Sequence, residues 1–106
     1  MAKFLVKASY SMDGTKGVQS AGGTSRREAV AKLAESLGGS LESFYFAFGE
    51  TDAYVVLDVP DNKSAAAASI AVNASGAATS EVIVLLTPEE IDEAAKISVD
   101  YRPPGS

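Results

Sequence analysis

Four strand-like segments, each with side chains of two alternating kinds, limit the possible folds of this chain most strongly. Residues 4–10, 41–48, 53–59 and 81–86 are rich in the β-branched and aromatic residues that favour strands. Successive side chains of a strand point to opposite faces of a sheet. One predicted face is uniformly apolar and should pack against helices; its members are Phe4, Val6, Ala8, Phe44, Phe46, Phe48, Ala53, Val55, Leu57, Val82, Val84 and Leu86.

The opposite predicted face mixes large apolar side chains with charged ones. A face in contact with water would not collect so many large apolar groups, and a plain core would not contain Lys7, Asp58 and Glu81. We therefore expect another surface, itself partly polar, to cover this face. Its members are Leu5, Lys7, Ser9, Ser43, Tyr45, Ala47, Tyr54, Val56, Asp58, Glu81, Ile83 and Leu85.

Helical patterns separate the strands. The first runs over 15–37, after a turn at Asp13-Gly14, and Gly22-Gly23 interrupts it with a kink or short loop. After that break, Ser25 and Glu28 have the spacing of a capping box.

Two further helices are predicted towards the C-terminus. Asp61 is a suitable N-cap for the Ala-rich segment 64–74, and Gly76 suits its end. The segment 87–90, Thr-Pro-Glu-Glu, is typical of a helix start. The segment 49–52 is expected to be a tight hairpin connection.

The order of these elements predicts an α+β fold of the ferredoxin-like βαββαβ type, with a four-stranded antiparallel sheet and an extra C-terminal helix. We expect one domain over 1–100 and an extended tail over 101–106. Because the helices cover only one side of the sheet, a second copy of the chain is the simplest cover for the other side. The predicted assembly is a dimeric α/β barrel, either as a homodimer or as a multiple of dimers.

Composition excludes several classes of function. Nine Lys and Arg against 14 Asp and Glu give a net charge of −5, so no basic face exists for nucleic acid. The chain has no Cys and no His, which excludes Cys/His zinc sites. Carboxylates alone can still bind Mg²⁺ or Ca²⁺, but no acidic spacing resembles an EF-hand, so we expect no metal and no cofactor. The N-terminus lacks the apolar core of a secretory signal, and the longest apolar run, near 65–68, is too short for a membrane span. We therefore expect a cytoplasmic protein.

Several segments resemble the GYD-domain family of small bacterial and archaeal proteins. They are residues 22–29 (GGTSRREA), 41–49 (LESFYFAFG), 71–76 (AVNASG) and 86–90 (LTPEE), which together extend over nearly the whole chain. The namesake tripeptide corresponds to residues 49–52, where only Gly49 and Asp52 match and the Tyr is absent. The resemblance implies a ferredoxin-like, dimeric α/β-barrel fold and no particular reaction.

The mixed face holds the main candidate ligand-binding residues, Lys7, Tyr45, Tyr54 and Asp58. These side chains either pair across a subunit interface, which we favour, or line a pocket for a small anionic or polar metabolite.

Three further candidates lie outside this face, and each has a plainer structural interpretation. Arg27 and Arg26 either clamp an anion together, or one of them is an exposed helix charge and the other a partner for an acid such as Asp52. Asp52 is also suited to bonding its own backbone, and Asn73 to satisfying its amide through neighbouring backbone rather than a ligand.

Three functions are consistent with these features. We favour a homo-oligomeric module that binds a small ligand or has a regulatory role. The alternative is a small cofactor-independent enzyme, similar to monooxygenases or isomerases, with Lys7, Tyr45, Tyr54 and Asp58 as its acid–base set. The lack of His and of a recognisable nucleophile–base pair argues against an enzyme. A structural assembly protein is the third possibility.

Overall fold

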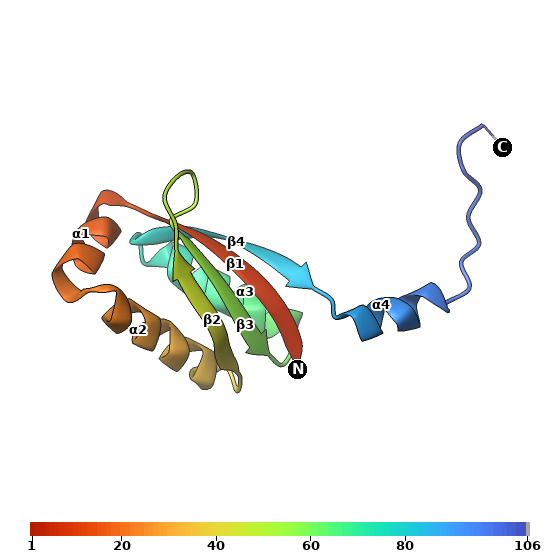
Figure 1. The fold of residues 1–106 in the computed structure, drawn as a ribbon, viewed down its shortest axis with the longest axis horizontal. Coiled ribbons are helices and arrows are strands. Elements are labelled where there is room, and N and C mark those ends of the chain that lie inside the picture. The colour runs from red at the N-terminus through yellow and green to blue at the C-terminus, as the bar shows by residue number, and fades with distance from the viewer. Residues whose placement is uncertain (106) are drawn as a thin grey trace.

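The predicted strands form one antiparallel sheet, in the order β2-β3-β1-β4, in a computed structural model that describes residues 1–105 (Figure 1). The strands β3 and β1 form the central pair, with β2 and β4 at the edges, and all neighbouring strands are antiparallel. This is the arrangement of a ferredoxin-like fold. The predicted fold class is thus confirmed. The strands are β1 (Ala2–Tyr10), β2 (Ser40–Phe46), β3 (Ala53–Val59) and β4 (Ala78–Leu85).

Four helices accompany the sheet: α1 (Met12–Ala21), α2 (Gly23–Ser36), α3 (Asn62–Ala74) and α4 (Pro88–Ala95). Two of the predicted helix starts are confirmed in detail. The Asp61 side chain accepts a hydrogen bond from the Ser64 backbone N–H at 2.9 Å. Thr87 and Glu90 form a complete capping box, with donor–acceptor distances of 3.1 and 2.9 Å.

The first crossover differs from the prediction in two places. Asp13-Gly14 is not a turn, because Ser11 caps a helix there and its side chain accepts a hydrogen bond from the Gly14 N–H at 3.1 Å. Gly22, with φ of 89°, ends α1 and begins α2 directly. As a result α2 starts earlier than expected, and Ser25 lies inside the helix rather than at its cap, so its predicted capping box does not form.

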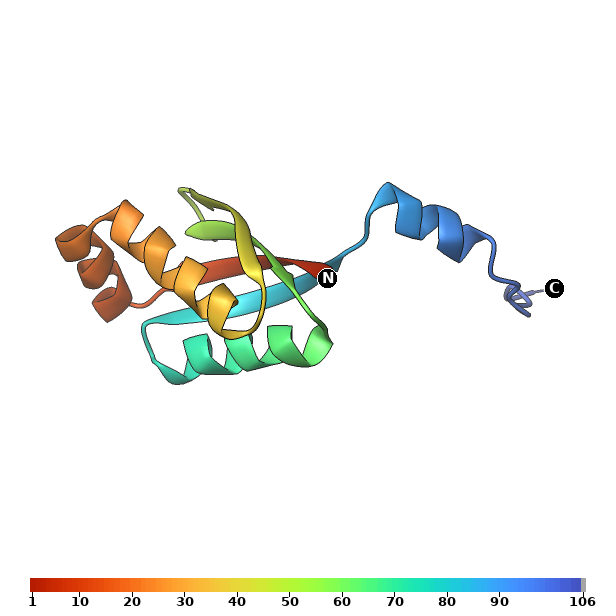
Figure 2. The same ribbon diagram turned by 90° about the horizontal axis from the view of Figure 1, so that it is seen from below.

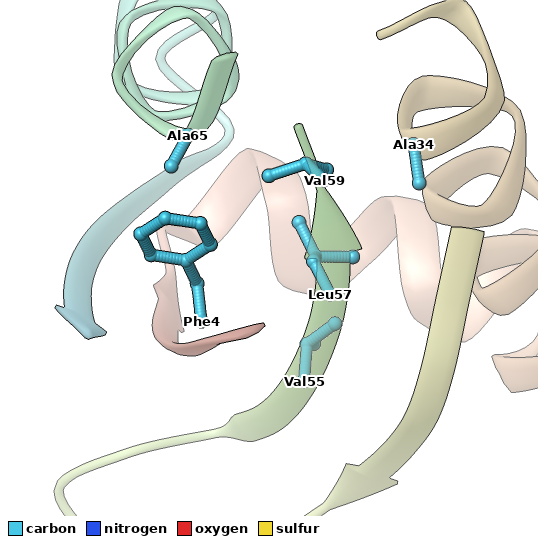
Figure 3. Packing of buried hydrophobic residues seen from close by; sticks show 6 residues of the cluster. All are labelled: Phe4, Ala34, Val55, Leu57, Val59 and Ala65. Carbon is cyan, nitrogen blue, oxygen red and sulfur yellow. The ribbon is translucent and has the colours of Figure 1, made fainter. Parts of the chain in front are cut away.

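The core lies between the sheet and the pair α2 and α3, which pack against the same face (Figure 2). Ala34 from α2 and Ala65 from α3 approach strand residues Phe4 and Leu57 closely (Figure 3). Phe4 and Val59 are the largest fully buried side chains. The core is therefore thin, since alanine rather than a larger residue provides much of the helix contact.

The ends of the apolar face are less covered than predicted. Helices do not bury Phe46, Val84 or Leu86, which remain 44%, 56% and 56% exposed. Phe48 lies beyond the end of β2, in the 47–52 connection, and is fully exposed. This connection is longer than the predicted tight hairpin and is closed by the hydrogen bond from Ala47 N–H to the Asp52 carbonyl at 2.8 Å.

The C-terminal part of the chain leaves the sheet at the end of β4. There α4 and the segment after it project away from the other elements (Figures 1 and 2), and the molecule measures 57 × 33 × 22 Å along its principal axes. Ile91, Ile97, Val99 and Tyr101 are all more than half exposed on this arm. Of the predicted tail, residues 101–103 have no regular structure and Ser106 lies outside the described residues.

Candidate functional site

The face of the sheet opposite α2 and α3, here called the open face, is covered by no other element among residues 1–105. The strand register confirms the composition predicted from alternation, since Leu5 pairs with Val56 on one side and Ile83 on the other. Large side chains therefore meet solvent, with Tyr45 72% exposed and Tyr54 40% exposed. Such a mixed surface is unusual on an isolated sheet.

Three predicted site residues are brought together towards one end of the open face, where β2 ends and β3 begins. Lys7 lies opposite Tyr54 in the β1–β3 pair, and Tyr54 lies opposite Tyr45 in the β3–β2 pair. On its other side Lys7 lies opposite Glu81 of β4, with Nζ 4.0 Å from Oε2. One cation, one carboxylate and two phenols thus form a row across all four strands, which we call the polar row.

Asp58 lies at the other end of the open face, apart from the polar row. It pairs with Lys3 in the β1–β3 register, and Lys3 Nζ is 3.5 Å from its Oδ2 and 3.1 Å from Glu42 Oε2. The hydrogen bond to Glu42 raises the pKa of Lys3 above its ordinary value, and the charges of both carboxylates add to this effect. The second oxygen of Asp58, Oδ1, is buried without a hydrogen-bond partner among the described residues. Within one chain, therefore, the four proposed acid–base residues do not converge.

A β-bulge explains how Glu42 reaches this cluster. Leu41 pairs with Leu57 and Ser43 with Val56, so Glu42 is an extra residue in β2. The bulge turns Leu41 towards the helix-covered face, where it packs against the core. Sequence reasoning missed both Lys3 and Glu42. Starting the first predicted strand one residue earlier would have indicated Lys3, because Lys3, Leu5 and Lys7 alternate along it. The bulge at Glu42 leaves no local signal in the sequence.

Asp52 and Asn73 have structural roles in the chain. The Asp52 carboxylate accepts a hydrogen bond from the Tyr10 backbone N–H at 2.9 Å, which ties the hairpin to the end of β1. Asn73 is exposed rather than buried, and its Oδ1 accepts from the Ser80 N–H at 2.8 Å and the Ser80 hydroxyl at 3.2 Å. This pair of bonds joins α3 to β4. Both side chains bond protein groups, although Asp52 bonds the backbone of β1 rather than that of its own hairpin and Asn73 bonds β4 rather than the adjacent helix backbone.

Arg27 is exposed near the start of α2 and far from the polar row in the fold, since α2 packs on the other face of the sheet. It borders a shallow depression that Gly23, Thr24, Phe44 and Phe46 also line. The neighbouring Arg26 differs from it, because its guanidinium carbon lies 5.7 Å from the centre of the Tyr10 ring. The two arginines therefore do not form one clamp.

Two general searches of residues 1–105 give negative results. None of their helices has the length and apolar character needed to cross a bilayer. No three His, Cys, Asp or Glu side chains in this part of the chain are grouped so that they would hold a metal ion.

Comparison with known proteins identifies the family. No curated protein and no solved structure matches the chain. The family model described as the GYD domain matches residues 4–95, which include all the strands and helices apart from the first two residues of β1. The chain therefore belongs to the GYD domain family.

Proposed function

We propose that this protein is a homo-oligomeric binding or regulatory module in which two copies join through their open faces to form a dimeric α/β barrel. The observation that supports this most strongly is the uncovered apolar part of the open face, which includes Leu5, Val56 and Ile83. Both packed helices lie on the other side, so no element of the sheet-forming unit removes these side chains from water. Burial of apolar surface contributes about 25 cal/mol per Å².

The charges of the open face also suit contact between two copies. In a two-fold interface the same patch meets itself, so it must contain groups of both signs. The open face has Lys3 and Lys7 as cations and Glu42, Asp58 and Glu81 as acids. An opposing copy supplies partners for groups that are incompletely paired within one chain, such as Lys7 and Glu81, whose charged atoms are 4.0 Å apart.

The polar row is the proposed ligand site of this dimer. The 4.0 Å separation between Lys7 and Glu81 is at the outer limit for an ion pair, and a lysine ammonium has three donors. Enclosed between two copies, Lys7, Tyr45 and Tyr54 would offer donors to a small anionic or polar metabolite. We prefer binding to catalysis because Asp58, the expected acid–base partner, lies at the other end of the face.

Matched lysine substitutions test the interface. Ile83→Lys places a charge on the open face, whereas Ile70→Lys makes the same change on α3, where the side chain is already 69% exposed. Sedimentation velocity is expected to give a dimer for the wild type and for Ile70→Lys, and a monomer for Ile83→Lys. A monomeric wild type, or a Ile83→Lys variant that is as dimeric as Ile70→Lys, would refute the proposed interface.

Native mass spectrometry of protein purified without added ligand tests the polar row. We expect a dimer that retains a small bound mass, and loss of that mass from Lys7→Met with the dimer intact. A dimer without any bound mass, or with a mass that Lys7→Met keeps, would leave the assembly in place and contradict the ligand site.

A further inference from the structure

A narrow apolar cleft lies between α2 and α3 on the helix-covered face of the sheet. The space within it that water-sized molecules can occupy is about 40 Å³, and the cleft continues into open solvent. Val6 and Val55 belong to its floor, and Val30 of α2 and Val72 of α3 to its walls. Ala68 deepens it, because a methyl group there occupies little of the space between α3 and the sheet. Pockets of this kind, mostly apolar with few polar groups, are typical of sites for small molecules.

Arg26 supplies the positive charge of this cleft. It lines the cleft and also the neighbouring depression between α1 and α2, and its guanidinium stacks near the Tyr10 ring. Its Nε is buried and has no hydrogen-bond partner among the described residues. A buried donor without an acceptor costs free energy. A hydrogen bond from Arg26 to an acceptor outside the chain would therefore be favourable.

Arg26 has no ion-pair partner among the described residues, although Asp13 lines the neighbouring depression with it. No acidic side chain of the described chain lines the cleft itself. The first turn of α2, just before Arg26, contains no acidic residue either. Because the N-terminal end of a helix carries partial positive charge, a cation there is electrostatically unfavourable. An anion beside Arg26 would relieve this.

We propose that the cleft binds a small monocarboxylate with an apolar tail. The carboxylate would accept hydrogen bonds from the Arg26 guanidinium, including Nε once a shift of this side chain exposes it, and the tail would lie along the apolar floor. A single guanidinium matches one negative charge, and the lining gives no second cation for a doubly charged phosphate. Two hydroxyls, Ser69 and Ser80, lie 3.2 Å apart on the cleft wall and add a minor polar contact.

This site is independent of the proposed dimer, because the cleft and the open face lie on opposite sides of the sheet. The two proposals can therefore fail separately. Octanoate binding by a chain that sediments as a monomer would refute the dimer alone, and a dimer without octanoate binding would refute the cleft site alone.

The test is a titration of the full chain with octanoate, and separately with 1-octanol, followed by ¹H–¹⁵N and methyl NMR spectra. Saturable shifts are expected at Val30 and Val72, with octanoate bound at least about tenfold more tightly than octanol because a charged hydrogen bond is involved. Arg26→Gln is expected to weaken octanoate binding roughly tenfold or more and to leave octanol unaffected. Arg27→Gln is the matched control, since Arg27 is the next residue on the same helix and does not line the cleft.

Several outcomes would overturn the proposal. These are equal affinity for octanoate and octanol in the wild type, no saturable shifts with either, or the same loss of octanoate binding in Arg27→Gln as in Arg26→Gln. If Arg26→Gln fails to give a folded spectrum, the comparison of octanoate with octanol in the wild type still decides the matter.

Discussion

Gly14 and Gly17 of α1 test how this helix packs, because the same change to alanine has opposite expected effects at the two positions. Alanine is favoured over glycine by about 1 kcal/mol within a helix. At Gly17 an added Cβ meets no atom within 4 Å, so the whole gain is expected there. Gly17→Ala should therefore raise the free energy of unfolding by about 1 kcal/mol.

At Gly14 the added Cβ would collide with the backbone carbonyl of Ala77. That carbonyl is held in place, since it accepts hydrogen bonds from the Ser11 N–H at 2.9 Å and the Ser11 hydroxyl at 3.2 Å. Overpacking against a well-fixed neighbour costs about 1–3 kcal/mol. This cost equals or exceeds the helix gain, so Gly14→Ala should lower the free energy of unfolding by up to about 2 kcal/mol.

Urea unfolding followed by far-ultraviolet circular dichroism measures both variants. All samples should be at one protein concentration, because dimer formation makes stability depend on concentration. We expect similar m-values, a higher midpoint than the wild type for Gly17→Ala and a lower one for Gly14→Ala. If Gly14→Ala were as stable as Gly17→Ala, the close contact between α1 and Ala77 would be incorrect.

Two other predictions concern single side chains. Asn73→Ala removes the acceptor of the Ser80 N–H and should lower the free energy of unfolding by about 0.5–1.5 kcal/mol in urea titrations. Asn73→Asp keeps an acceptor and should lose less stability. Equal stability of Asn73→Ala and the wild type would contradict this role. The Ser64 backbone N–H, and then its hydroxyl, hold the pKa of Asp61 below its ordinary value of 3.8. A carboxylate with a lowered pKa stabilises the fold above its unfolded-state pKa, and this contribution disappears as pH falls through its folded-state pKa. The stability advantage of wild type over Asp61→Asn should therefore shrink between about pH 4 and about pH 2; an advantage independent of pH would refute the prediction.

The two faces of the sheet could be predicted from the sequence because they depend only on alternation along each strand. Leu5, Val56 and Ile83 were assigned to one face from their positions in three separate segments, and the register brings them side by side. Backbone geometry alone determines which side of a strand a residue occupies. The caps of α3 and α4 were predictable for a similar reason, since their signals lie within a few residues of one another.

Features that depend on pairing between distant segments were not predictable. The bulge at Glu42 is defined only by the alignment of β2 with β3, and it decides that Leu41 faces the core. The separation of Asp58 from Lys7 likewise follows from the β1–β3 register, in which Asp58 pairs with Lys3. The predicted site took all its side chains from one face of the sheet. It therefore combined the polar row around Lys7 with the cluster around Asp58, which the register keeps apart.

The cleft was also missed, although the sequence contained a partial signal for Arg26. Arg26 precedes Val30 and Leu33 at the spacing of one helix face, so it belongs to the buried stripe of α2, whereas Arg27 does not. The distance between α2 and α3, by contrast, depends on how their small side chains pack on the sheet. No local pattern encodes it.

Isotope-filtered NMR on a mixture of ¹³C-labelled and unlabelled chains tests the central claim, the joining of two open faces, most directly. We predict intermolecular nuclear Overhauser effects between methyl groups of the open face, from Leu5, Val56, Ile83 and Leu85. Ile70, on the opposite side of the molecule, should show none. The claim would be contradicted by the absence of intermolecular effects from the open face, or by effects that arise only from residues of the α4 arm.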